Sequence, residues 1–481
     1  MLMPSLPFDL RSLDTQILFA NWQMAPISKS TPKKAQHLVV LVHGLWGNPG
    51  HLNYIANALR DRYSEEEIIV LACRRNLGSL TYDGVNVGGE RVAKEVEDAV
   101  EELNRDGHEI TRFSIVGYSL GGLVARYAIG LLYHKGLFEK ITPVNFTTFV
   151  TPHLGVRTPL TGYQNHLWNV LGARLLSASG RQLFLSDRLG DSGRPLLSVL
   201  ADPDSIFIHA LARFQHRTLY TNIVNDRSAV YYTTGISRHD PFVDLTKLNL
   251  NYVKGYEPVI LDPDHPYDVI PQDEVPSLYQ RLSTQGHHYL RRAPILLALV
   301  VLLPIVLVAF VVNSGIQTLR SRRRIMLHEA DHHDEGFGLY RIPWMVQEMR
   351  VGLEDAFENV NASQEQEYLP EGSEIADAAV EDPVSSPVAF AKTSSESFRS
   401  EKSDNDELLQ SERSSSVPTL ALTAAQFAMI KALDDVGFRK FPVYIHKSTH
   451  SHAAIIVRVP KPAFEEGKLV VKHWLDNEFH I

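Results

Sequence analysis

The segment F-S-I-V-G-Y-S-L-G-G-L, residues 113–123, constrains the fold more than any other part of this chain. Its first residues form an apolar run typical of a buried strand, and the residues after Ser119 have a helical pattern. Gly117 and Gly121 flank the serine in the pattern G-x-S-x-G, where a larger side chain would collide with neighbouring backbone in a sharp turn. Unless the match is accidental, the segment predicts that Ser119 lies at the carboxyl edge of a sheet.

Further apolar runs alternate with helical patterns on both sides of this turn. Strand-like runs begin at His37, Ile68 and Asn145, and helical spacing covers about 52–63 and 90–104. Strands that alternate with helices at this spacing predict the α/β class. We expect a mostly parallel central sheet with helices on both faces.

Composition divides the 481 residues into parts. We expect a leader (1–34), a core (35–290) with a helical cap at about 156–215, an apolar membrane-associating segment with basic flanks (291–324), an insertion (325–418) that is acidic and largely disordered from residue 361, and a C-terminal part of the core (419–481). Residues 361–418 contain 13 acidic and 4 basic residues, which accounts for the net charge of -9. The remainder is neutral, so nothing favours nucleic acid as a partner.

The motif H-G-L-W-G, residues 43–47, follows the first predicted strand. A tetrahedral oxyanion needs two convergent backbone N–H groups, and one of them commonly comes from a loop at this position. The motif therefore predicts Leu45 and Leu120, the residue after the serine, as the two donors. The alternative is an ordinary glycine turn.

A serine nucleophile needs a histidine base that a carboxylate orients. Asp226 directly follows the strand-like run Y-T-N-I-V-N, at the place expected for the acid. Asp240 and Asp244 are later alternatives, and an aspartate after a strand is often only a turn residue.

The base must be chosen from 21 histidines. We expect it in a loop after the last core strand, and V-Y-I-H-K-S-T-H-S-H places His450 and His452 there. His452 is preferred because the small residues after it permit a close approach to the serine. His239, His287 and His288 remain alternatives.

The stretch from Ala293 to Val312 has twenty residues without a charge, which is long enough to cross a bilayer. A single crossing would separate His452 from Ser119, and Pro304 near the middle favours a turn. We therefore expect a hairpin or interfacial helix that enters one leaflet from the cytosolic side, consistent with basic residues at both ends. These flanking residues are Arg291, Arg292, Arg322, Arg323 and Arg324.

Two further patterns predict little. H-E-A-D-H-H, residues 328–333, lacks a second group of ligands, so we expect a solvated turn and no metal site. Cys73 is the only cysteine, and the first residues lack the pattern of a secretory signal. We therefore expect a chain that faces the cytosol.

Together these motifs resemble the fungal serine esterases and lipases of the α/β-hydrolase fold, in particular their lipid-droplet phospholipase branch. The segments that carry the resemblance are H-G-L-W-G at His43, T-Y-D-G-x-x-V-G-G-E-R-V-A at Thr81, G-Y-S-L-G-G at Gly117, T-P-H-L-G at Thr151, N-D-R-S at Asn225 and H-A-A-I-I-V-R at His452. They fall within about 37–290 and 425–475.

The resemblance implies an acyl-ester hydrolase that acts on lipids through Ser119, Asp226 and His452, without a metal or organic cofactor. A surface of a lipid droplet or of the endoplasmic reticulum is the expected location. A protein or acyl-CoA thioesterase remains an alternative, because the same site attacks thioesters. A membrane tether without catalytic activity is a second alternative, from another functional class.

Overall fold

The computed structural model describes residues 35–157, 177–189, 193–226, 228–270, 315–327 and 418–481, together with the single residues 312 and 368. The predicted leader, the first part of the predicted cap, most of the apolar segment and most of the acidic insertion lie outside the described residues. So do Arg291, Arg292, Pro304, His287, His288 and the motif at 328–333.

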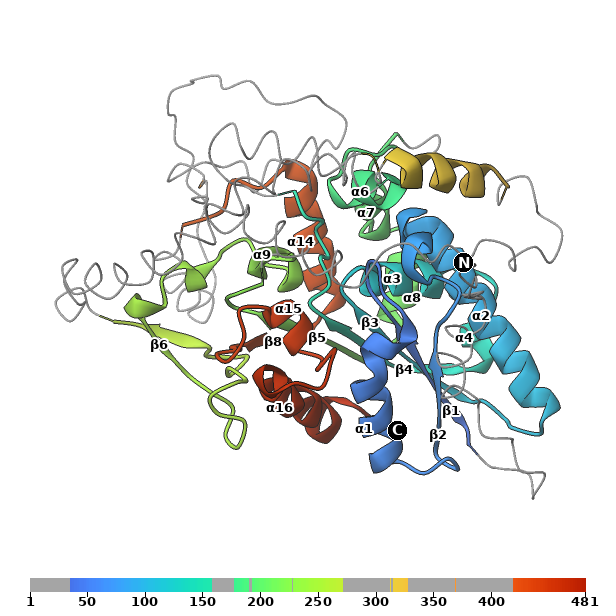
Figure 1. The fold of residues 1–481 in the computed structure, drawn as a ribbon, viewed down its shortest axis with the longest axis horizontal. Helices are drawn as coiled ribbons and strands as arrows, with labels where there is room; N and C mark the ends of the chain where they lie inside the picture. The colour runs from blue at the N-terminus through green and yellow to red at the C-terminus, as the bar shows by residue number, and fades with distance from the viewer. Residues whose placement is uncertain are drawn as a thin grey trace, which may run out of the picture.

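A six-stranded sheet with the order β2-β1-β3-β4-β5-β8 forms the centre of the described structure (Figure 1). All five neighbouring pairs are parallel. The strands are β1 (His37–Val42), β2 (Ile68–Ala72), β3 (Arg112–Tyr118), β4 (Thr142–Phe149), β5 (His216–Asn222) and β8 (Arg439–Val443). The prediction of an α/β fold with a mostly parallel sheet is confirmed.

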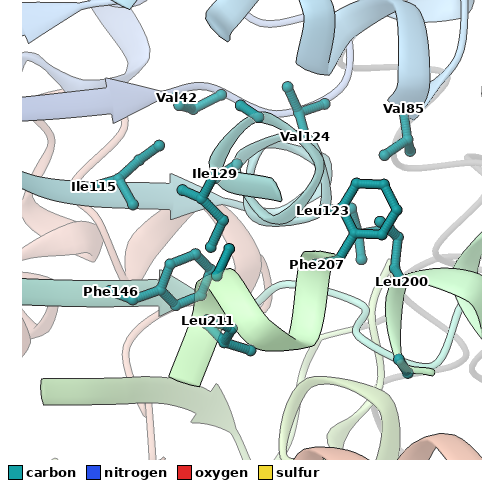
Figure 2. Packing of buried hydrophobic residues seen from close by; sticks show 14 of the residues in the cluster. Val42, Val85, Ile115, Leu123, Val124, Ile129, Phe146, Leu200, Phe207 and Leu211 are labelled. Carbon is teal, nitrogen blue, oxygen red and sulfur yellow. The ribbon is translucent and has the colours of Figure 1, made fainter. Parts of the chain in front are cut away.

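Helices cover both faces of this sheet. One face packs against α2 (Val85–Arg105), α3 (Leu120–His134), α8 (Ile206–Ala212) and α14 (Ala424–Val436), and the other against α1 (Asn53–Arg62) and α16 (Glu466–His473). Alternate residues of β1 point to opposite faces, because side chains alternate along a strand. Figure 2 shows the first core, where Ile115 and Phe146 of the sheet face Ile129 of α3.

The remaining elements are short. The helices are η1 (Pro49–Leu52), η2 (Gly78–Tyr82), α4 (Leu137–Lys140), α6 (Ser177–Leu183), α7 (Leu196–Leu200), α9 (Tyr231–Thr234), η4 (Pro241–Val243), η5 (Leu245–Lys247), α15 (Ser451–Ala454), η7 (Pro462–Phe464) and η8 (Trp474–Glu478). An antiparallel pair of β6 (Leu248–Leu250) and β7 (Tyr267–Val269) was not expected, because its strands are too short for a periodic pattern. A further helix spans residues 315–327.

Within these described ranges, no helix combines the length and the apolar character needed to cross a membrane. The apolar stretch from Ala293 is described only at Val312. The predicted hairpin therefore stays a prediction.

His473, at the end of α16, provides a test of the packing under the sheet. It is buried, and its Nδ1 lies 2.8 Å from the Tyr220 hydroxyl. Burial, and secondarily the charge of Arg439, lower the pKa of His473 from 6.5 to about 4. The folded protein therefore keeps this imidazole neutral at a pH where the unfolded chain is already protonated.

This difference predicts that stability is fully present above pH 6.5 and is lost as the pH falls toward 4. Between pH 8 and pH 5 the loss from His473 amounts to about 2 kcal/mol. His473→Gln should lower the free energy of unfolding at pH 8 and flatten its pH dependence, as measured by urea denaturation. Parallel curves for the variant and the wild type would contradict the buried, neutral state.

Candidate active site

Ser119 occupies the turn between β3 and α3. Its backbone has φ 55° and ψ -129°, a conformation that side chains other than glycine rarely adopt. Such a conformation persists only where the surrounding structure enforces it. Here the parallel strand ends at Tyr118 and the helix begins at Leu120, so the turn spans one residue.

Three glycines make the turn possible because neighbouring groups approach them too closely for any side chain. A Cβ on Gly117 would lie 2.3 Å from Gly122 Cα, and one on Gly121 would lie 2.2 Å from the Val42 carbonyl oxygen. A Cβ on Gly122 would lie 2.1 Å from Thr151 Oγ1. Gly122 was not singled out from the sequence, although the doublet of glycines after the serine is its visible sign.

The structure brings Ser119, His452 and Asp226 together although they come from distant parts of the chain. His452 Nε2 lies 2.9 Å from Ser119 Oγ. His452 Nδ1 lies 2.9 Å and 3.1 Å from the two carboxylate oxygens of Asp226. Because the carboxylate only accepts, Nδ1 carries the proton and Nε2 is free to accept from the serine hydroxyl.

Backbone and side-chain donors hold the Asp226 carboxylate in place. Asn222 Nδ2 donates to it at 3.0 Å, and the backbone N–H groups of Ala229 and Ser228 donate at 2.9 Å and 3.2 Å. The side chain of Asp226 is 1% exposed. These donors fix the carboxylate as an orienting group for the imidazole.

The alternative carboxylates have local roles at turns. Asp240 accepts from the backbone N–H of Phe242 at the start of η4, and Asp244 accepts from that of Thr246 at the start of η5. Both are helix-capping contacts within two residues of the aspartate. The carboxylate that lies at His452 Nδ1 is that of Asp226.

The loop after β8 places His452 on α15. Its backbone carbonyl accepts from the Tyr118 hydroxyl at 3.0 Å, and the two rings lie 5.3 Å apart. Ser451 Oγ donates to the Val224 carbonyl, which ties α15 to the segment before Asp226. His450 instead forms the N-terminal boundary of α15, and His239 lies 3.4 Å from the Pro418 carbonyl oxygen.

The predicted oxyanion turn packs directly against the serine. A Cβ on Gly44 would lie 2.8 Å from Ser119 Cβ, so the turn that carries Leu45 passes beside the nucleophile. Trp46 has φ 53°, and its N–H donates to Thr81 Oγ1 at 3.0 Å. Leu120 is the first residue of α3, where backbone N–H groups have no partner within the helix.

Buried polar groups behind the site were missed as functional candidates. Arg126 of α3 is buried and donates to the Leu200 carbonyl at 2.9 Å, and burial lowers its pKa to about 9. His153 lies 3.0 Å from Thr148 Oγ1, and burial holds its pKa well below 6.5. Both residues fix the loop after β4, for which the block T-P-H-L-G was the only sign in the sequence.

Among the residues that the structure describes, no group of three or more histidine, cysteine, aspartate or glutamate side chains is arranged to bind a metal. The motif at 328–333 lies outside them.

A protein-family model matches part of this chain. The family model described as "Putative serine esterase (DUF676)" matches residues 32–239, which include Ser119 and Asp226. Residues 32–239 are thus similar to that family. The family match ends before His452, so the position of that histidine is known from the fold alone.

Curated proteins that are similar to this chain include two yeast proteins. The chain is 34% identical over 255 residues to "Putative lipase ROG1" of Saccharomyces cerevisiae, which covers 51% of this chain and 35% of that protein. It is 30% identical over 210 residues to "Putative lipase C4A8.10" of Schizosaccharomyces pombe. That match covers 42% of this chain and 26% of the relative. The match thus spans about a third or less of these relatives.

Solved structures with some likeness include two α/β-hydrolases. "Phospholipase PlaB from Legionella pneumophila" is 14% identical with a TM-score of 0.26, covering 42% of this chain and 43% of its own. The thioesterase RedJ of Streptomyces coelicolor is 18% identical with a TM-score of 0.23, covering 44% and 83%. The α/β-hydrolase fold of this chain is assigned from its own parallel sheet and from the turn at Ser119.

Gly121→Ala tests the close approach at the turn. The added methyl group would meet the carbonyl oxygens of Val42 and His43, so the backbone must shift. We expect the free energy of unfolding to fall by about 1–3 kcal/mol, as measured by urea denaturation. Gly315→Ala is the matched control, because a Cβ at that helical position would meet no described atom within 4 Å outside its own helix and chain neighbours. Equal stability of the two variants would contradict the packing at Gly121.

Proposed function

We propose that this protein hydrolyses carboxylic esters of lipids through an acyl-enzyme intermediate on Ser119. The single observation behind this proposal is the continuous chain of hydrogen bonds from Ser119 Oγ through His452 to Asp226. A serine hydroxyl is a weak nucleophile, and this arrangement is the one that activates it.

His452 acts as the base in the first step. As Ser119 Oγ attacks the acyl carbonyl carbon, its proton moves to His452 Nε2. Asp226 stabilises the imidazolium and keeps the proton on Nδ1. The leaving alcohol then takes the proton from Nε2 as the carbonyl is restored, which leaves the acyl group on Ser119.

The backbone N–H groups of Leu45 and Leu120 bind the oxyanion of the tetrahedral intermediate. One donor of this kind lowers the barrier by about 3 kcal/mol. Its effect is large because the donors are already oriented before the reaction. A water molecule, activated by His452, then attacks the acyl-enzyme and releases the fatty acid.

The lipid part of the proposal draws on the relatives and on the sequence. The yeast relatives are named as lipases, and the chain carries an apolar stretch from Ala293 to Val312. A hydrolase attached to a lipid surface meets water-insoluble esters without having to extract them first. We infer a lipid droplet or the cytosolic face of the endoplasmic reticulum as that surface.

Ser119→Ala tests the nucleophile. We expect hydrolysis of phospholipid and triacylglycerol emulsions to fall by about 10⁴-fold or more, and labelling by a serine-reactive fluorophosphonate to disappear. Ser64→Ala, which changes an exposed serine outside the active site, should retain both the hydrolysis and the labelling. Labelling that survives in Ser119→Ala would overturn the assignment. Cleavage of palmitoyl thioesters alone would replace the ester substrate with a thioester.

The two neighbouring histidines provide a matched test of the base. His452→Ala should reduce ester hydrolysis by about 10³-fold or more, because Ser119 then has no proton acceptor. His450→Ala should stay close to the wild type. Comparable activities of the two variants, measured with a short soluble ester, would refute the role of His452.

A further inference from the structure

Helix 315–327, gold in Figure 1, buries polar side chains and exposes apolar ones, which is the reverse of an ordinary surface helix. A helix on a globular protein normally buries its apolar face and exposes its polar face. In this helix Ser321 is fully buried and Gln317 is nearly so, whereas Leu319 is 68% exposed. The arrangement needs an explanation beyond packing.

An ion pair attaches the polar face to the core. The Arg324 guanidinium donates to both carboxylate oxygens of Asp83, at 2.6 Å to 3.1 Å, and also to the Ser79 carbonyl. The Asp83 side chain is fully buried and also pairs with Arg91 at 2.8 Å. Arg324 therefore holds the helix in place, which corrects its expected place among the arginines that meet lipid.

The outward face is an apolar stripe. At 100° per residue, the stripe residues lie opposite Ser321, and Arg320 and Arg322 lie on its two sides. The exposed apolar residues of the stripe are Ile316, Leu319 and Met326, with Leu327 at its edge. Arg323 lies within the stripe, and no acidic residue occurs between 315 and 327.

This combination has the chemistry of a helix at a membrane interface. Such helices lie in the plane of the surface, bury an apolar stripe at the boundary of the acyl chains, and place arginines at its sides. The long arginine side chains cover apolar surface while their charges reach the headgroups. The absence of acidic residues from the helix makes its charge complementary to anionic lipid.

The attachment point of the helix is hydrogen-bonded to the predicted oxyanion turn. The segment Ser79–Asp83, which Arg324 binds, contains Thr81, whose hydroxyl accepts from Trp46 in the oxyanion turn. Thr81 carbonyl oxygen accepts from Ser179 of α6 as well. A surface bound by the helix would therefore lie against the part of the molecule that contains Ser119.

We propose that helix 315–327 is a docking surface for anionic phospholipid, in which Arg320, Arg322 and Arg323 bind headgroups and the apolar stripe enters the interface. Arg324 and Asp83 connect this surface rigidly to the oxyanion turn. Docking does not depend on catalysis by Ser119, so the two proposals can fail separately.

The test measures binding of the full chain, carrying Ser119→Ala, to phosphatidylcholine vesicles with and without phosphatidylserine. Each arginine near an anionic surface contributes about fivefold to binding, so Arg320→Gln, Arg322→Gln and Arg323→Gln together should lower the preference for anionic vesicles by about 100-fold. The matched control replaces three exposed basic residues elsewhere, Arg105, Lys140 and Lys431, with glutamine. The control should keep most of the preference.

Arg324→Gln separates attachment from lipid contact. Its binding to anionic vesicles should fall clearly less than that of the triple variant, because the three lipid-facing arginines remain although the helix loses its ion pair with Asp83. Equal losses in the triple variant and its control would show a general charge effect and overturn the proposal. A loss in Arg324→Gln as large as in the triple variant would also overturn the proposal. So would dimerisation of the chain through the stripe together with unchanged binding of the triple variant to anionic vesicles.

Discussion

The parallel pairing of β5 with β8 is the interaction on which the rest of the site depends. It aligns Asn222 with Val443 at the carboxyl ends of two strands that are more than 200 residues apart in sequence. Asp226 follows one strand and His452 follows the other, so both side chains reach the edge where Ser119 lies. Pro442 lies in β8, an edge strand of the described sheet, and its carbonyl oxygen accepts from the Leu261 N–H at 2.9 Å on the side away from β5.

The turn at Ser119 illustrates how the core supports local strain. A residue other than glycine with positive φ costs about 1–3 kcal/mol, and the structure keeps it because β3 and α3 are fixed on both sides. The same close packing excludes side chains at Gly117 and Gly121. The close packing of β3 and α3 therefore both stabilises the core and holds Ser119 in its strained turn.

The sequence predicted the fold class and named the three residues that the structure brings together, because each depends on short patterns. A strand, a glycine pair and a serine are visible within eleven residues, and Asp226 stands directly after a strand. The choice of His452 over His450 depends on how α15 orients the two side chains, which the sequence does not show. Their catalytic roles stay predictions until they are measured.

Contacts between distant residues could not be predicted in this way. The pairing of Arg324 with Asp83 spans 241 positions, and a row of arginines beside an apolar run gives no sign of which one turns inward. The short β6-β7 pair and the buried Arg126 are similar cases. Each is decided by the neighbours that folding supplies rather than by a local period.

The most direct test of the central claim is to trap the acyl-enzyme. The protein is mixed with a p-nitrophenyl ester of a fatty acid, quenched rapidly, digested and analysed by mass spectrometry. A transient acyl group on the peptide that contains Ser119, absent from the Ser119→Ala variant, is the predicted result. An acyl group on another residue, or the same adduct in Ser119→Ala, would contradict the account.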